Sequence, residues 1–139
     1  MRLFVDANVL FTAAHNLDGR SAALVRLASH RRCQLVASRH AIEEARRNLE
    51  VKHPDAIPRL EELLLVVSVC AECPSEKAEW ARAHSLPEKD APILGAAAHC
   101  CADLLVTGDR THFGHLYGKN LGGVLIVTPA EALRLVMAD

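Results

Sequence analysis

The chain alternates between short apolar runs and longer stretches with helical spacing, and this alternation constrains its fold more than any other feature. The apolar runs predict five buried strands, at residues 3–5, 34–37, 65–70, 103–107 and 124–128. The remaining stretches predict helices at residues 7–14, 19–32, 38–53, 55–64, 75–84, 90–101 and 129–137. Uninterrupted apolar strands between amphipathic helices indicate a parallel sheet that is covered on both faces. Because crossovers between parallel strands are right-handed, we expect an α/β fold, a three-layer α/β/α sandwich around a central five-stranded parallel sheet.

Residues with strong local preferences support these helix starts. Ser38 is a good N-cap for the helix at 38–53. Pro92 fits only the first turn of a helix, which places Asp90 at or next to the N-cap. Thr128 followed by Pro129 repeats that pattern. The chain has 139 residues, of which half are apolar, so we expect a single domain over residues 1–139 with a substantial core.

The composition argues against a membrane protein and against a secreted, disulfide-bonded one. No apolar run approaches the roughly 18 residues that a membrane span requires. The first residues lack the apolar segment of a secretory signal, and five cysteines do not suit a disulfide framework, so we expect a cytoplasmic protein with reduced thiols. The pair Cys70 and Cys73, with His99, Cys100 and Cys101, leaves a structural zinc site as a weaker alternative.

The net charge of −1 gives no overall attraction to nucleic acid, but the charge is unevenly distributed. Between Arg20 and Arg59 the sequence has nine basic and four acidic residues. Such a segment can contact phosphates beside an acidic centre. It can equally be the solvated faces of two helices, and the sequence leaves both interpretations open.

Four acidic residues are predicted to meet at one edge of the sheet. Asp6 follows the first strand, Asp109 follows the strand at 103–107, Asp90 begins a helix and Glu44 lies on the helix at 38–53. Ligands of open α/β sheets bind at the carboxyl ends of the strands. Carboxylates gathered there repel one another unless a hard cation such as Mg²⁺ or Mn²⁺ neutralises them. The competing explanation is that the aspartates only cap the helices that follow them.

Either Glu44 or its neighbour Glu43 could be the glutamate of this acidic group. The core face of their helix is set by Ile42, Ala45 and Leu49, and the two glutamates flank it on opposite sides. The side of Glu43 carries Arg39, Arg46, Arg47 and Glu50, which is typical of a solvated face. We therefore prefer Glu44. His112 and His115, the closest histidine pair, are expected to line a surface turn.

These acidic segments resemble the motifs of the PIN-domain nucleases. The resemblance runs from Met1 to about Thr128 and rests on four segments: Val-Asp6-Ala-Asn8-Val-Leu, Ser38 with Glu44-Ala-Arg-Arg-Asn-Leu, Lys89-Asp90-Ala-Pro-Ile-Leu, and Leu-Val-Thr107-Gly-Asp109-Arg-x-x-Phe113. It implies Asp6, Glu44, Asp90 and Asp109 as the catalytic quartet. Asp6, Asp90 and Asp109 would hold Mg²⁺ or Mn²⁺, and Asn8 and Thr107 would support the site. The family usually has Thr or Ser at the position of Asn8, and the segment 53–72 matches no motif.

The resemblance implies a metal-dependent endoribonuclease that cleaves RNA by means of a metal-activated water. Small single-domain bacterial members are toxins of toxin–antitoxin pairs of the VapC type, often dimeric, so the expected partners are RNA, a small antitoxin and a second copy of the chain. Arg39, Arg46 and Arg110 are the candidates to hold substrate phosphates. Alternatives are a housekeeping RNA-processing nuclease and a non-catalytic PIN-like module that binds a partner. Because only 4% of residues are aromatic, extended base stacking is not expected.

Overall fold

One sheet of six strands forms the centre of the computed structural model, which describes residues 1–139. Its order is β3-β2-β1-β4-β6-β5. The bounds are β1 (Arg2–Val5), β2 (Gln34–Ser38), β3 (Val67–Cys70), β4 (Leu104–Val106), β5 (Asn120–Leu121) and β6 (Val124–Val127). Strands β1 to β4 and β6 pair in parallel, and β5 pairs antiparallel with β6. The five predicted parallel strands are therefore confirmed, but β3 at the sheet edge is not buried as predicted, and a sixth short strand is added at the other edge.

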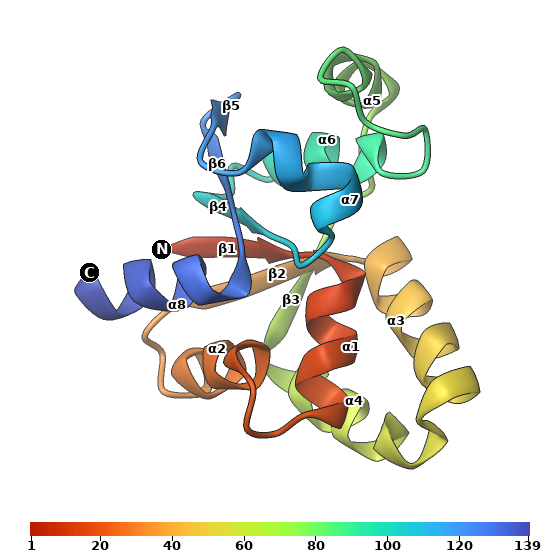
Figure 1. The fold of residues 1–139 in the computed structure, drawn as a ribbon, viewed down its shortest axis with the longest axis vertical. Coiled ribbons are helices and arrows are strands. Elements are labelled where there is room, and N and C mark those ends of the chain that lie inside the picture. The colour runs from red at the N-terminus through yellow and green to blue at the C-terminus, as the bar shows by residue number, and fades with distance from the viewer.

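Helices cover both faces of this sheet, so the predicted three-layer α/β/α architecture is confirmed (Figure 1). One layer contains α1 (Ala7–His15), α2 (Arg20–Ser29), α3 (Arg39–Lys52), α4 (Ile57–Leu63) and α8 (Pro129–Ala138). The other layer contains α5 (Ser75–Arg82), α6 (Ala91–His99) and α7 (Arg110–Phe113). None of the helices combines the length and the apolar character needed to cross a membrane.

The differences from the predicted elements lie where a helix meets a strand. Short 3-10 turns form at Pro54–Ala56, Leu64–Val66 and Gly114–Leu116. The second of these turns takes Leu65 and Val66 out of the predicted strand, and Leu65 is left 84% exposed. Strand β5 was not predicted because two residues are too few to show an alternating pattern. It forms because Gly122 and Gly123, both at positive φ, close a tight hairpin onto β6.

The two central strands explain why the apolar runs are uninterrupted. Leu3, Phe4 and Val5 of β1 are fully buried, and so are Leu105 and Val106 of β4. They belong to a single hydrophobic core of 38 residues that extends through both helical layers. Strands that are covered on both faces need apolar side chains at every position rather than at alternate ones.

The register of β1 and β4 places their next residues side by side. Leu3 pairs with Leu104 and Val5 with Val106 in parallel. Both strands therefore end at the same level, and Asp6 and Thr107 follow at the carboxyl edge of the sheet. This is the edge at which α1 and α7 begin (Figure 1).

Candidate active site

Asp6 is fixed by the strand before it and by the helix after it. Its backbone N–H donates to the carbonyl oxygen of Val106, 3.0 Å away. One carboxylate oxygen caps α1 by accepting from the N–H of Ala7 at 2.8 Å. The other accepts from the hydroxyl of Thr107 at 2.9 Å and from the side-chain amide of Asn8 at 3.1 Å. The carboxylate is thus both a helix cap and a buried group at the sheet edge, and the residue is 5% exposed.

Asn8 and Thr107 connect Asp6 to the loop that carries Asp109. The amide nitrogen of Asn8 lies 3.2 Å from the Thr107 hydroxyl, and its amide oxygen accepts from the N–H of Gly108 at 2.7 Å. The Thr107 hydroxyl also accepts from the N–H of Asp109 at 3.1 Å. A Cβ at Gly108 would lie 3.2 Å from the Asn8 oxygen, so glycine allows this close approach. The two predicted supporting residues therefore lie between the acidic ones.

Asp90, Asp109 and His112 form a second group at the same edge. The Nδ1 atom of His112 lies 2.9 Å from Oδ2 of Asp90 and 2.8 Å from Oδ2 of Asp109. Asp109 caps α7, since its other oxygen accepts from the N–H of His112 at 3.1 Å. Asp90 sits at the N-cap of α6 but makes no capping hydrogen bond with its side chain. The competing explanation, that Asp90 serves only as a helix cap, therefore has no support in its side-chain contacts.

Two atoms of this group are buried without a hydrogen-bond partner. They are Oδ2 of Asp90 and Nδ1 of His112. The two atoms are close enough to interact, but they are not aligned as a hydrogen bond. A buried polar atom without a partner costs free energy, so its presence indicates a group that binds something else. Carboxylate oxygens with an unused acceptor fit a divalent cation.

The side of α3 that faces the site carries Glu44 rather than Glu43. Glu44 is half-buried and lines the same cleft as Asn8 and Asp109. Glu43 is exposed and lines a different pocket, together with Arg39 and Arg46. The choice between the two glutamates, which the helix flanks favoured, agrees with this placement.

The carboxylates are close enough to change one another's acidity. Burial raises the pKa of Asp6 to about 6, against the lowering effect of its hydrogen bonds, and the charges of Glu44 and Asp90 raise it further. Burial is also the main cause of the raised pKa of Asp90, with Asp109 and Glu44 adding to it while Lys89 and His112 oppose it. The charges of the four acidic residues therefore repel one another, and a bound cation would reduce this repulsion.

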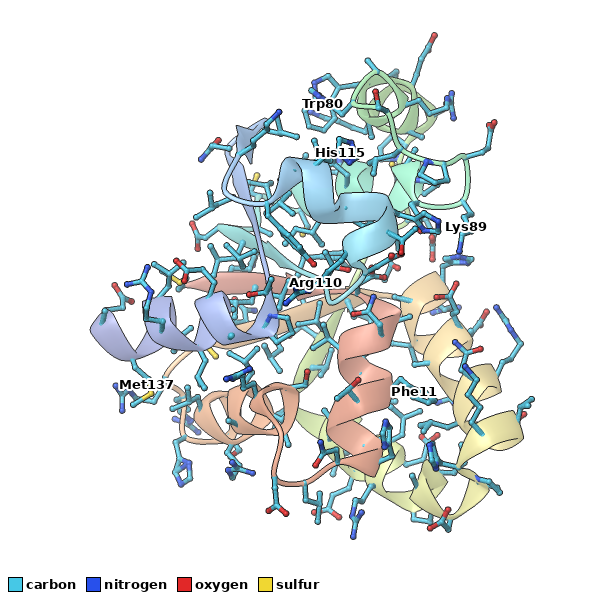
Figure 2. The ribbon with its side chains drawn as sticks, viewed as in Figure 1. Phe11, Trp80, Lys89, Arg110, His115 and Met137 are labelled. Carbon is cyan, nitrogen blue, oxygen red and sulfur yellow. The ribbon has the colours of Figure 1, made fainter.

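The cleft beside this group has a volume of about 890 Å³, and only two of its 15 lining residues are apolar. It extends from Glu44 and Asp109 to the first turn of α2, and Arg20 and Arg110 are its two basic residues. In Figure 2, Arg110 lies between α7 and the other helical layer. Such a polar lining suits a charged ligand better than an apolar one.

Two of the three predicted phosphate-binding arginines do not lie in this cleft. Arg39 and Arg46 line the pocket of Glu43, and Arg46 forms an ion pair with Glu61 at 2.9 Å. The physical reason is the helical period of α3, which puts these arginines on the side of Glu43, away from Glu44. Arg110 remains, and it is joined by Arg20, which belongs to the basic segment between Arg20 and Arg59 but was not one of the three named candidates.

The sequence interpretation also missed His112, which does not line a surface turn. The spacing of three residues between Asp109 and His112 could have indicated this position. If Asp109 is the N-cap of a helix, the residue three positions later faces the cap, so His112 is brought onto the carboxylate. His115 is exposed and contacts the carbonyl oxygen of His84. The five cysteines are free, and Asp90, Asp109 and His112 are a set of three possible metal ligands whose ligand atoms already lie within 4.8 Å of one another.

A family profile described as PIN domain matches residues 2–111, which is most of the chain. The chain belongs to the PIN-domain family. PIN-domain proteins are nucleases that use divalent metals. The matched span of this PIN-domain protein includes the four acidic residues, so the predicted family membership is confirmed.

Solved structures share the fold at low sequence identity. PAE2754 from Pyrobaculum aerophilum is 21% identical with a TM-score of 0.71, over 100% of this chain and 97% of that one. VapBC2 from Rickettsia felis, solved with a bound DNA fragment from the VapBC2 promoter, is 14% identical with a TM-score of 0.67. The match covers 92% of this chain and 98% of that one. VapC20 from Mycobacterium tuberculosis, described as a sarcin–ricin loop cleaving toxin, is 17% identical with a TM-score of 0.57, over 78% and 91%. No curated protein matches this PIN-domain protein in sequence.

Proposed function

We propose that this PIN-domain protein is a divalent-metal-dependent endoribonuclease. One observation carries the proposal: acidic residues from four separate segments lie close enough to raise one another's pKa beside a polar cleft that Glu44 and Asp109 line, and a buried carboxylate oxygen of Asp90 has no hydrogen-bond partner. Helix capping explains the positions of Asp6 and Asp109 in part, but folding does not explain the Asp90 oxygen, because an unpaired buried carboxylate destabilises a protein. It is explained by a function that uses a cation.

Each residue of the site has a role that follows from its contacts. Asp6, Asp90 and Asp109 would hold Mg²⁺ or Mn²⁺ through their carboxylates. When bound, such an ion lowers the pKa of a coordinated water and offsets the charge that develops on a phosphate. Thr107 and Asn8 orient Asp6 through the hydrogen bonds described above. Glu44, across the cleft, would orient the incoming water and accept its proton.

RNA is the proposed substrate, held mainly through its phosphates. Arg110 and Arg20 lie in the cleft with the acidic residues and would contact phosphates on either side of the cleaved bond. Attack by water would leave 5′-phosphate and 3′-hydroxyl ends. With few aromatic residues in the chain, target choice would depend on RNA shape and loop contacts rather than on stacking.

We further propose that the protein acts as the toxin of a toxin–antitoxin pair, in the cytoplasm and as a homodimer, with a small antitoxin as its partner. The fold shared with VapC20, which is described as a toxin, and with VapBC2 supports this role. A housekeeping role in RNA processing is the second candidate, since the same site would serve both. A neighbouring gene for a small DNA-binding protein would favour the toxin.

Cleavage of a mixed RNA pool tests the nuclease activity. We expect cleavage that requires Mn²⁺ or Mg²⁺, stops with a chelator and falls by at least about a hundredfold in Asp6→Asn. The matched pair Glu44→Gln and Glu43→Gln separates the site from general charge effects, because only Glu44 lines the cleft. Equal activity in wild type and Asp6→Asn, or no activity in either with Mn²⁺ present, contradicts the proposal and favours a non-catalytic module that binds a partner.

A further inference from the structure

The imidazole of His112 occupies an unusual position between two carboxylates. Its Nδ1 atom is buried and lies within 3 Å of an oxygen of Asp90 and of an oxygen of Asp109. The first turn of α7 holds it there, because Asp109 caps the N–H of His112 itself. The position is thus fixed by the backbone and not by a flexible side chain alone.

A simple ion pair does not account for this contact. A protonated imidazole would donate its Nδ1 hydrogen along the ring plane to one of the oxygens. Neither contact is aligned in that way, and both Nδ1 of His112 and Oδ2 of Asp90 remain without a hydrogen bond. Asp90 is only 8% exposed, so water does not readily satisfy its oxygen. Three possible ligand atoms therefore converge here, and two of them have no hydrogen-bond partner in the protein.

Their spacing is that of ligands around one ion. Adjacent ligands of an octahedral divalent ion with bonds of about 2.1 Å are separated by about 3 Å. The two nitrogen–oxygen distances are 2.9 and 2.8 Å, and all three atoms lie within 4.8 Å of one another. The nitrogen of His112 could therefore be the neighbour of each of the two oxygens around one metal ion without a large movement of the chain.

We propose that His112 is a nitrogen ligand of the metal that Asp90 and Asp109 hold, and that this ligand makes the site prefer Mn²⁺ to Mg²⁺. The inference rests on the metal-dependent function proposed above and adds a residue and a selectivity to it. Mg²⁺ favours oxygen ligands and gives up its water reluctantly, whereas an imidazole nitrogen suits transition metals. A site made only of carboxylates lacks this source of discrimination.

The test compares metal binding to the wild type and to His112→Asn. The amide oxygen of an asparagine reaches about as far as Nδ1 of the histidine, so this variant replaces a nitrogen ligand with an oxygen. Dissociation constants for Mn²⁺ and Mg²⁺ would be measured by titration calorimetry on chelator-treated protein. We expect the preference for Mn²⁺ over Mg²⁺ to fall about tenfold or more in His112→Asn. The absorption spectrum of bound Co²⁺ should change in the same variant.

His115→Asn is the matched control, because His115 lies three residues later and points toward α5 and Trp80 (Figure 2). Its metal preference should equal that of the wild type. A preference that is unchanged in His112→Asn, or tighter binding of Mn²⁺ in His112→Ala, would overturn the inference. In either case the wild type still binds metal and the proposed function stands. A wild type that binds neither ion would overturn both proposals. Circular dichroism of the metal-free variants shows whether each has folded.

Discussion

At the scale of single residues, a buried carboxylate is costly, and Asp6 shows the cost most clearly. Its pKa is about 6 in the folded protein, against an ordinary value of 3.8. Between these two pH values the folded chain retains a proton that the unfolded chain has lost. The stability of the metal-free protein should therefore fall as pH rises from about 4 to about 6, with the whole cost present above that range. The shift corresponds to at most about 3 kcal/mol.

Asp6→Asn removes this cost without changing the size of the side chain. We expect the variant to raise the free energy of unfolding of the metal-free protein by about 1–3 kcal/mol at neutral pH, and by much less near pH 4. The gain stays below the full cost because the new amide faces the amide of Asn8. Urea denaturation at both pH values measures the difference.

Asp55→Asn serves as the control, since it removes one carboxylate charge at an exposed position. If Asp6→Asn changed stability by the same amount at both pH values, the raised pKa of Asp6 would be refuted.

The sequence predicted the position of most acidic residues because the backbone determines it. Asp6 and Asp109 follow buried strands, and Asp90 begins a helix that Pro92 identifies. Glu44 could be separated from Glu43 by the residues on each side of its helix. The arginines were harder to place, since a long side chain can reach in many directions and the sequence does not show where the cleft extends. Arg20 is an example, because no residue pattern around it indicates that it lies in the same cleft as Asp109.

At the scale of elements, α5 packs closely on α6, the helix that begins after Asp90. Gly95 lies in the middle of α6, and a Cβ there would come within 2.4 Å of the Cys73 sulfur and 3.0 Å of the backbone of Lys77. Glycine in a helix normally costs stability relative to alanine, by about 1 kcal/mol. Its presence here is explained by the contact between the two helices.

Gly95→Ala should therefore destabilise the protein although alanine favours a helix. We expect a loss of about 1–3 kcal/mol in the free energy of unfolding, since the clash outweighs the gain in helix propensity. Gly114→Ala is the control, because its added Cβ would meet only the Cβ of Arg110, at 4.0 Å. Thermal or urea denaturation of the two variants compares them directly, and equal stability would show that α5 moves aside without cost.

Elements with a clear hydrophobic period were predicted well, and those that depend on distant partners were not. Strand β1 is apolar throughout because two layers cover it, a pattern visible in the sequence alone. Strand β5 exists only because β6 lies beside it. Strand β3 lies at the other edge of the sheet, where Val69 is 57% exposed, so its apolar residues do not mark where the strand begins.

At the scale of the whole molecule, the acidic centre links pH, metal and stability. A bound divalent ion would neutralise the repulsion among the carboxylates, so it should stabilise the folded protein and weaken the pH dependence described for Asp6. At a Mn²⁺ concentration about 100 times the dissociation constant, we expect about 2.7 kcal/mol of stabilisation. Thermal denaturation with and without Mn²⁺ at several pH values measures this.

Asp109→Asn should lose most of the stabilisation by Mn²⁺, because it removes a carboxylate of the proposed site. Asp55→Asn should keep this stabilisation, because Asp55 is exposed and does not line the cleft. A melting temperature that rises equally with Mn²⁺ in all three proteins would mean that the ion stabilises the chain elsewhere.

The pairing of β1 with β4 at the middle of the sheet has a consequence during synthesis. It joins Asp6 to Thr107, which are separated by 101 positions in the chain. A ribosome must therefore synthesise the chain beyond Thr107 before the acidic centre can form. If the chain is the ribonuclease proposed above, this order of events would protect the message being translated, since the nascent chain could not yet cleave it.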